Sequence, residues 1–166
     1  TFTTDLSSAT TNTAKGYADA INLNTGVHGA EVNAFNTLTS DAVGTFRMAG
    51  NISINGDTIA IANSYEDLVS KINEEASGVK ATLNSNDTIT LSNVDGANIT
   101  IAEAASGNAA SVGFTVGDYN GFLSITNLDG SGVTIEAGSE TNGYKDGAGT
   151  IADVQSLGFN EFSKAG

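Results

Sequence analysis

The chain has 166 residues and a formal net charge of −13, from 19 acidic and 6 basic residues. It contains no cysteine, which excludes disulfides and thiolate chemistry. Its acidic balance disfavours nucleic acid and anionic membranes as partners, because both are negatively charged. Hydrophobic residues make up 39% of the chain, with no Trp, while Gly contributes 20 residues and Pro none. These proportions predict a thin aliphatic core and short strands joined by turns of Gly, Asn and Asp.

The length allows one compact domain or two small lobes. No apolar run approaches the roughly 20 residues of a membrane-spanning helix, and the start lacks the basic and apolar stretches of a signal peptide. Both ends fall within patterned sequence, so we expect the chain to be a fragment of a longer protein.

Residues 1–44 are predicted to form a partial unit, beginning with a short strand near Phe2 and Leu6 and a loop. A helix follows, because apolar residues recur at helical spacing. These residues are Ala14, Tyr17, Ala18 and Ile21. Gly26 is expected to end the helix. The next strand is expected to contain Val27, Ala30, Val32 and Ala34.

Residues 45–113 are predicted to form a complete unit that opens with a β-hairpin. Its first strand carries apolar residues two or four positions apart, which places them on one face. These residues are Phe46, Met48, Ile52 and Ile54. Asn55-Gly56 suits a type I′ turn, because both residues tolerate positive φ. Residues 58–61 form the predicted return strand, with Ile59 and Ile61 on one face.

The spacing of apolar residues then changes to that of a helix. Ser64 is expected to cap this helix, Asp67 lies in its first turn, and Gly78 is placed to end it. Its apolar stripe consists of Tyr65, Leu68, Val69, Ile72 and Ala76. Alternation resumes in three strands of a predicted antiparallel meander, with turns at Asn86-Asp87 and Asp95-Gly96. The alternating residues are Val79, Ala81 and Leu83, then Ile89 and Leu91, then Ile99 and Ile101. We expect one shared core that includes Ile52, Ile54, Leu68, Ile72, Ile89 and Ile101.

Parts of the chain resemble one another, which is typical of stacked supersecondary units. Ala20-Ile21-Asn22 matches Lys71-Ile72-Asn73, and Gly26-Val27 matches Gly78-Val79. Residues 89–101 and 123–135 align without gaps, so each is predicted to be a hairpin with an Asp-Gly turn. Ser111-Val112-Gly113-Phe114 also recurs, as Ser156-Leu157-Gly158-Phe159.

Residues 114–166 are predicted to hold the second hairpin unit and a closing segment. Within them, residues 139–150 form the longest polar, Gly-rich interval and are expected to be a surface loop. Residues 151–162 are expected to form a helical turn and then a strand that pairs with the N-terminal one. The predicted fold is α+β and β-rich, built from repeated small units of a β-hairpin, one helix and an antiparallel β-meander.

The complete unit resembles the flagellin hook IN motif, which occurs in the outer domains of bacterial flagellins. The resemblance covers about a third of the chain and depends on an ordered series of short matches. These are Ile54-Asn55-Gly56, Asp67-Leu68-Val69, Lys71-Ile72-Asn73 and Gly78-Val79-Lys80-Ala81, followed by the Ile89/Leu91 and Ile99/Ile101 strands.

The resemblance implies a variable outer domain, D2 with or without D3, of an extracellular flagellin. Such a domain is a structural part of the flagellar filament, supports motility, and forms the antigenic surface that antibodies meet. Its partners would be other flagellin subunits, with O-linked glycans on surface Ser or Thr. The conserved helices that build the filament shaft in that family are absent from this sequence, so we expect this chain alone not to polymerise.

Two alternatives stay open. A filament-capping or hook-associated protein can carry similar motifs. The chain can also be an adhesin-like module that binds a glycan or a host protein, although such sites usually gather aromatic residues. The four tyrosines are scattered through the sequence, at Tyr17, Tyr65, Tyr119 and Tyr144.

We assign no catalytic, cofactor-binding or metal-binding residue and no cofactor, and we do not expect an enzyme. His28, the single histidine, follows a helix end and is interpreted as a surface or capping residue. The pairs Glu66-Asp67 and Glu74-Glu75 are neighbours on one helix, so they cannot flank a substrate as paired carboxylates do.

The glycine-containing motifs are interpreted as turns. Residues 93–96 and 127–130 lack the ligand spacing of a calcium loop. Gly147-Ala148-Gly149 lacks the strand and helix of a phosphate loop. Acceptor patterns for N-glycosylation at Asn51, Asn86 and Asn98 are expected by chance in a chain rich in Asn and Thr.

Overall fold

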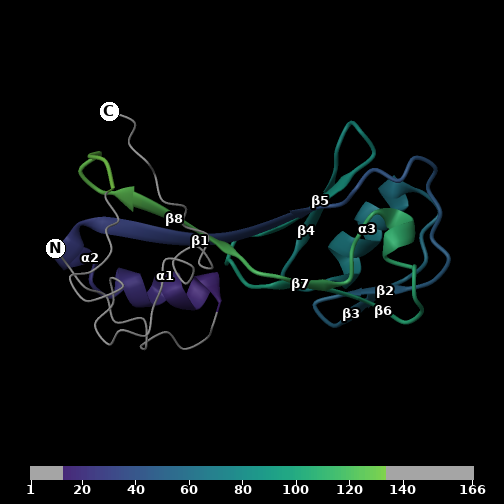
Figure 1. The fold of residues 1–166 in the computed structure, drawn as a ribbon, viewed down its shortest axis with the longest axis horizontal. Helices are drawn as coiled ribbons and strands as arrows, with labels where there is room; N and C mark the ends of the chain where they lie inside the picture. The colour runs from purple at the N-terminus through teal and green to yellow at the C-terminus, as the bar shows by residue number, and fades with distance from the viewer. Residues whose placement is uncertain (1–12, 134–166) are drawn as a thin grey trace, which may run out of the picture. The chain divides into compact units, whose positions relative to one another are not determined.

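The computed structural model describes residues 13–133 (Figure 1). The described chain is strand-rich α+β with antiparallel sheets, as the sequence predicted. It divides into two compact units: residues 1–34 with 122–166, and residues 35–121. The second unit is therefore an insertion within the first along the chain. The predicted segments 1–44, 45–113 and 114–166 follow sequence repeats, whereas these units divide within strand β1 and before strand β8.

The first unit contains helices α1 (Ala14–Asn22) and α2 (Thr25–His28), the start of β1 (Ala30–Thr39), and β8 (Phe122–Asn127). Thr13 caps α1, because its hydroxyl oxygen accepts a 3.2 Å hydrogen bond from the Gly16 amide. The buried residues of α1 are all small, and at about 100° per residue they fall on two opposite sides of the helix. They are Ala14, Gly16, Ala18 and Ala20.

The predicted end of this first helix is wrong. Helix α1 already ends at Asn22, and Gly26 and Val27 lie inside α2. The Val27 side chain is 71% exposed and starts no strand. Gly29 makes the turn instead, with a left-handed φ of 74° that suits glycine, and β1 begins at Ala30.

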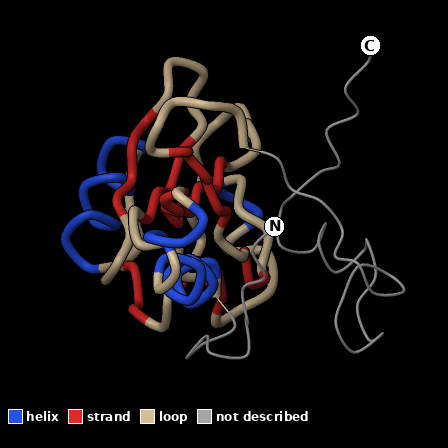
Figure 2. The backbone as a smooth tube through the Cα atoms, turned by 90° about the vertical axis from the view of Figure 1, so that its left-hand side faces the viewer, coloured by secondary structure: helices blue, strands red, loops and turns tan. Residues whose placement is uncertain are grey.

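The second unit contains two antiparallel groups of strands (Figures 1 and 2). In one, β5 (Ile89–Asn93) lies between β4 (Lys80–Leu83) and the later part of β1. The other has the order β3-β2-β6-β7. Its strands are β2 (Ile52–Ile54), β3 (Asp57–Ile59), β6 (Ile99–Glu103) and β7 (Gly117–Tyr119). A short 3₁₀ helix, η2 (Ala110–Val112), precedes β7.

The local signals around helix α3 (Tyr65–Glu75) are confirmed. The β2–β3 turn has φ values of 53° at Asn55 and 89° at Gly56, as a type I′ turn requires. The Ser64 hydroxyl accepts a 3.2 Å hydrogen bond from the Asp67 amide and so caps α3. Gly78 is the exception among these signals, because it does not end the helix as predicted. Helix α3 already ends at Glu75, with Ala76 extended after it, and Gly78, with φ of 74°, makes the left-handed turn that leads into β4.

One hydrophobic core fills the second unit, and all the predicted core residues belong to it. Ile52, Ile54, Leu68, Ile72, Ile89 and Ile101 are at most 1% exposed. Phe46 and Tyr65 add an edge-to-face ring contact with centroids 4.9 Å apart. Helix α3 and the two strand groups therefore contribute their aliphatic side chains to one shared core.

The predicted strand around Phe46 is wrong, because only Ile52–Ile54 is extended and paired. Met48 is buried in a loop, where its sulfur accepts a 3.3 Å hydrogen bond from the Ala62 amide. The return strand is likewise shorter than predicted. It ends at Ile59, and Ile61 is 49% exposed instead of sharing its face.

The predicted hairpin over residues 89–101 is also wrong, and with it the three-strand meander. Strand β5 pairs with β4 and β1, whereas β6 pairs with β2 and β7. The Asp95-Gly96 turn therefore carries the chain from one strand group to the other. Both strands still bury alternate residues in the same core, so their alternation could not reveal that they are not partners. In the second predicted hairpin, Val133 of the return strand is described, is 40% exposed and lies in no strand. Ile135, the closing segment and the predicted strand near Phe2 and Leu6 lie outside the described residues.

The stability of the second unit should be sensitive to Gly113. Its φ is 85°, and a Cβ there would overlap the carbonyl oxygen of Asp41. Gly113→Ala should therefore lower the free energy of unfolding by more than about 2 kcal/mol, measured by urea denaturation. Gly107→Ala is the matched control, since Gly107 has φ of 92° but open space around its Cα. Equal losses in the two variants would contradict a steric role for Gly113.

Candidate functional site

His28 acts as the capping residue that the sequence suggested. Its Nδ1 accepts a 3.1 Å hydrogen bond from the Ala30 amide, so in the neutral ring the proton is on Nε2. That nitrogen lies 3.0 Å from the Ile21 carbonyl oxygen, to which it donates. Both ring nitrogens are thus used to hold the chain between α1 and β1.

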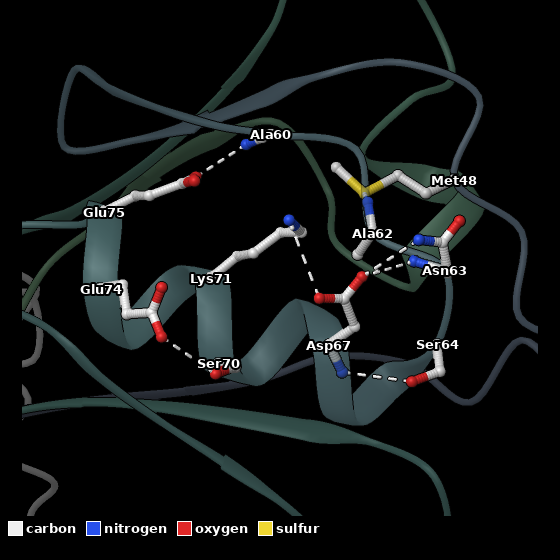
Figure 3. A network of polar contacts seen from close by, with 10 residues as sticks. All are labelled: Met48, Ala60, Ala62, Asn63, Ser64, Asp67, Ser70, Lys71, Glu74 and Glu75. Atoms are coloured by element: carbon white, nitrogen blue, oxygen red, sulfur yellow. Dashed lines mark hydrogen bonds and ion pairs between the residues drawn. The ribbon is translucent and has the colours of Figure 1, made fainter.

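The acidic side chains of α3 are spread along the helix and bind the chain around it (Figure 3). Asp67 accepts a 2.9 Å hydrogen bond from the Asn63 amide and lies 3.8 Å from the Lys71 ammonium. Glu75 accepts a 2.8 Å bond from the Ala60 amide, and Glu74 accepts a 3.3 Å bond from the Ser70 hydroxyl. The carboxylates therefore do not form an acid–base pair.

Two further carboxylates stabilise loops through backbone amides. Glu103 accepts hydrogen bonds from Ala109, at 2.7 Å, and Gly107, at 2.9 Å, and these bonds hold the pKa of its carboxyl below the usual value. Asp57 accepts a 2.7 Å bond from the Ser77 amide, which lowers its pKa in the same way. In both residues, the hydrogen bonds from backbone amides stabilise the ionised form of the carboxyl group.

The Asp-Gly segments act as turns. In one, Asn93 accepts a 2.7 Å hydrogen bond from the Asp95 amide. In the other, Asp129 accepts a 2.8 Å bond from the Ser131 amide. Among residues 13–133, no cluster of His, Asp or Glu side chains could hold a metal ion. The Gly147-Ala148-Gly149 run lies outside the described residues.

The tyrosines do not gather in the described part of the chain. Tyr65 is buried against Phe46, and burial raises the pKa of its hydroxyl, with Asp87 adding to the effect. The Tyr119 hydroxyl donates to the Thr115 carbonyl oxygen at 2.8 Å, and Tyr17 lies half-buried on α1. Tyr144 lies outside the described residues. The described tyrosines therefore do not form an aromatic platform for a sugar.

The most specific polar contact is one that the sequence analysis missed, an asparagine that clamps a strand. The Asn73 side chain donates to the Ala81 carbonyl oxygen at 3.1 Å and accepts from the Ala81 amide at 2.8 Å. A neutral amide has both a donor and an acceptor, so it can take the place of a neighbouring strand. Strand β4 has β5 on one side only, and Asn73 pairs with its backbone.

The same clamp occurs in the first unit. Asn22 at the end of α1 donates to the Val32 carbonyl oxygen at 2.7 Å and accepts from the Val32 amide at 2.8 Å. Gly29 and Gly78 follow the two clamps with the same φ of 74°. The structural counterpart of Gly78 is therefore Gly29, not Gly26 as the sequence alignment had it, because α2 occupies the extra residues.

Two more asparagines hold the second unit together. Asn55 in the hairpin turn donates to the Ser77 carbonyl oxygen at 3.2 Å and accepts from the Thr100 amide at 2.9 Å. Asn93 donates to the Gly78 carbonyl oxygen at 2.6 Å. These contacts fix the hairpin, the turn after α3 and the end of β5. The sequence did contain a signal for these residues. Asn73 and Asn93 have matching asparagines in the repeats, at Asn22 and Asn127, and Asn55 belongs to the Ile54-Asn55-Gly56 match.

No model of a known protein family matches the chain, and no curated protein matches its sequence. Within the described residues, no helix has the length and apolar character needed to cross a lipid bilayer.

The Asn73 clamp can be tested by substitution. Asn73→Ala should lower the free energy of unfolding by about 1–2 kcal/mol, because two hydrogen bonds to β4 are lost. Asn73→Asp should lose at least as much at pH 7, because a carboxylate cannot donate to the Ala81 carbonyl oxygen. Urea denaturation measures both, with Asn120→Ala at an exposed site as the control. Full retention of stability in Asn73→Asp would contradict the clamp.

The Glu103 contacts predict a pH dependence. Because its pKa in the folded chain is lowered, the carboxylate contributes stability above its unfolded value, near 4.5, that is lost as the pH falls further. The stability difference between the wild type and Glu103→Gln should therefore be largest at neutral pH and shrink below about pH 4.5. Denaturation at several pH values measures it. Glu31→Gln, on β1, controls for the loss of one charge and should show no such trend if the amide contacts are responsible.

Proposed function

We propose that this chain is a surface-exposed outer module of a bacterial flagellin, a structural part of the flagellar filament. On this proposal it is extracellular, its partners are other flagellin subunits, and its exposed surface is the antigenic face of the filament. The module supports motility by its shape and its exposure, and it carries no enzymatic activity.

The observation that carries the proposal is the role of the residues that resemble the hook IN motif. Asn55 links the hairpin to Ser77 and Thr100, and Asn73 clamps Ala81. Ile72 is fully buried in the core beside them. The short matches of the resemblance therefore coincide with contacts that hold one unit together, so the series is more than a chance set of turns.

The character of the described surface agrees with a display module. Glu75, Asp67 and Glu103 bind backbone amides and so serve the scaffold. The net charge of −13 favours solubility where many copies are packed at high density. Exposed Ser and Thr residues permit O-linked glycans.

A filament-capping or hook-associated protein is the alternative that shares these features, because the unit itself would be the same. The gene sequence on either side of the chain separates the two, since only a flagellin would place the module between the shaft-forming helices. An adhesin is less well supported, because the described tyrosines do not form a binding platform.

Immunogold labelling tests the proposal directly. Antibodies raised against this chain should label the whole length of filaments on cells that carry the gene, and a deletion strain should not be labelled. Labelling at the filament tip alone would indicate a capping protein, and labelling at the filament base alone a hook-associated protein. Labelling of the cell body would contradict all three.

The 166 residues on their own should also remain unpolymerised, because the resemblance implies that helices outside the outer domain form the shaft in flagellins. Light scattering and electron microscopy should detect no filaments under conditions in which a full-length flagellin assembles. Filaments built by the isolated chain would contradict the proposed outer position of the module.

A further inference from the structure

The first unit has an apolar face that is less covered than its counterpart in the second unit. Ile21 on α1 and Leu123 and Ile125 on β8 are only partly buried. Their counterparts in the repeat are fully buried, and they are Ile72, Ile89 and Leu91, each 0% exposed. The three side chains of the first unit are therefore less buried than the side chains at the matching positions of the second unit. We call the set Ile21, Leu123 and Ile125 the open face.

A short segment just before β7 supplies part of this cover in the second unit. Its three apolar residues are buried in the core: Ala109 and Val112 are 0% exposed and Phe114 is 2% exposed. Gly113 makes the left-handed turn between them, and its carbonyl oxygen accepts a 2.8 Å hydrogen bond from the Asp41 amide. The segment thus acts as a plug that backbone contacts hold in place.

The pattern of this plug recurs near the end of the chain. Val154, Leu157 and Phe159 repeat the spacing of the buried residues, and Gly158 stands where Gly113 stands. Ser156 likewise repeats Ser111, whose hydroxyl donates to the Asn108 carbonyl oxygen at 2.6 Å. Residues 154–159 lie outside the described residues, and along the chain they follow β8, the last described strand of the first unit. Each unit therefore has one plug sequence.

We propose that the open face of the first unit is a docking surface for residues 154–159 of the same chain. The apolar residues of this segment cover Ile21, Leu123 and Ile125 as Ala109, Val112 and Phe114 fill the core of the second unit. Three matched apolar positions and one matched glycine select this segment over any other in the chain. The occupant is thus intramolecular, and each plug serves the unit to which it belongs.

Hydrogen exchange of backbone amides in the whole chain tests the proposal, with a reciprocal pair of variants. Phe159→Asp should speed exchange in α1 and β8 more than about tenfold and leave β2, β5 and α3 unchanged, because a charge in the plug prevents docking. Phe114→Asp should do the reverse. Asn160→Asp adds the same charge beside the plug and should change neither unit. Phe159→Leu, which keeps an apolar side chain, should retain most of the protection of α1.

The outcomes separate the occupants of the face. Unchanged exchange of α1 in Phe159→Asp would overturn the proposal, and so would equal effects of Phe159→Asp and Asn160→Asp. Protection of α1 that rises with protein concentration and is insensitive to Phe159→Asp would assign the face to a second copy of the chain. Protection of α1 that falls with Phe159→Asp at every concentration supports the intramolecular plug.

Discussion

Each unit depends on one kind of contact. In it, the side-chain amide of an asparagine forms hydrogen bonds with both backbone groups of one strand residue. Asn73 and Asn22 lie in the last turns of their helices, and each pairs with a residue of the next strand at 2.7–3.1 Å. A helix end leaves carbonyl groups without partners, and a strand edge leaves amides and carbonyls unpaired. One side chain that both donates and accepts fixes the helix and the strand to each other without an additional strand. This is an economical solution for a unit whose strands have only three to ten residues.

The two units share one order of elements, which shows where along the chain the second unit is inserted. In both units an Asn lies in the last turn of a helix, a Gly with φ of 74° turns the chain, and a strand follows that pairs with a second one. In the second unit the two strands, β4 and β5, are separated by a short turn. In the first unit β1 and β8 are the corresponding pair, and residues 35–121 are inserted between them. A hairpin connection tolerates such an insertion, because its two ends stay close together.

The sequence predicted those parts of the fold that local chemistry determines. Ser64 as a cap and Asn55-Gly56 as a type I′ turn were correct, because each depends on one or two residues and their neighbours. The core was correct because burial follows periodicity. Strand pairing was not, since β5 and β6 bury alternate residues alike whether or not they are partners. The sequence analysis missed the clamps because residue type and helix position alone do not distinguish two kinds of Asn. An Asn that binds a strand eight or ten residues further along looks the same in sequence as an Asn that faces solvent.

The direction of these contacts bears on the proposed role of the chain as a display module. Asn55, Asn73, Asn93, Glu75 and Glu103 all bind backbone atoms rather than other side chains. A contact to the backbone does not by itself constrain the identity of the residue that it reaches, as at Ala60. Exposed side chains such as Val94 and Leu128 can therefore change without the loss of a scaffold contact. On the proposed role, exposed positions without a scaffold contact are free to vary, whereas exposed residues that hold the backbone, such as Asn55 and Asn73, are not.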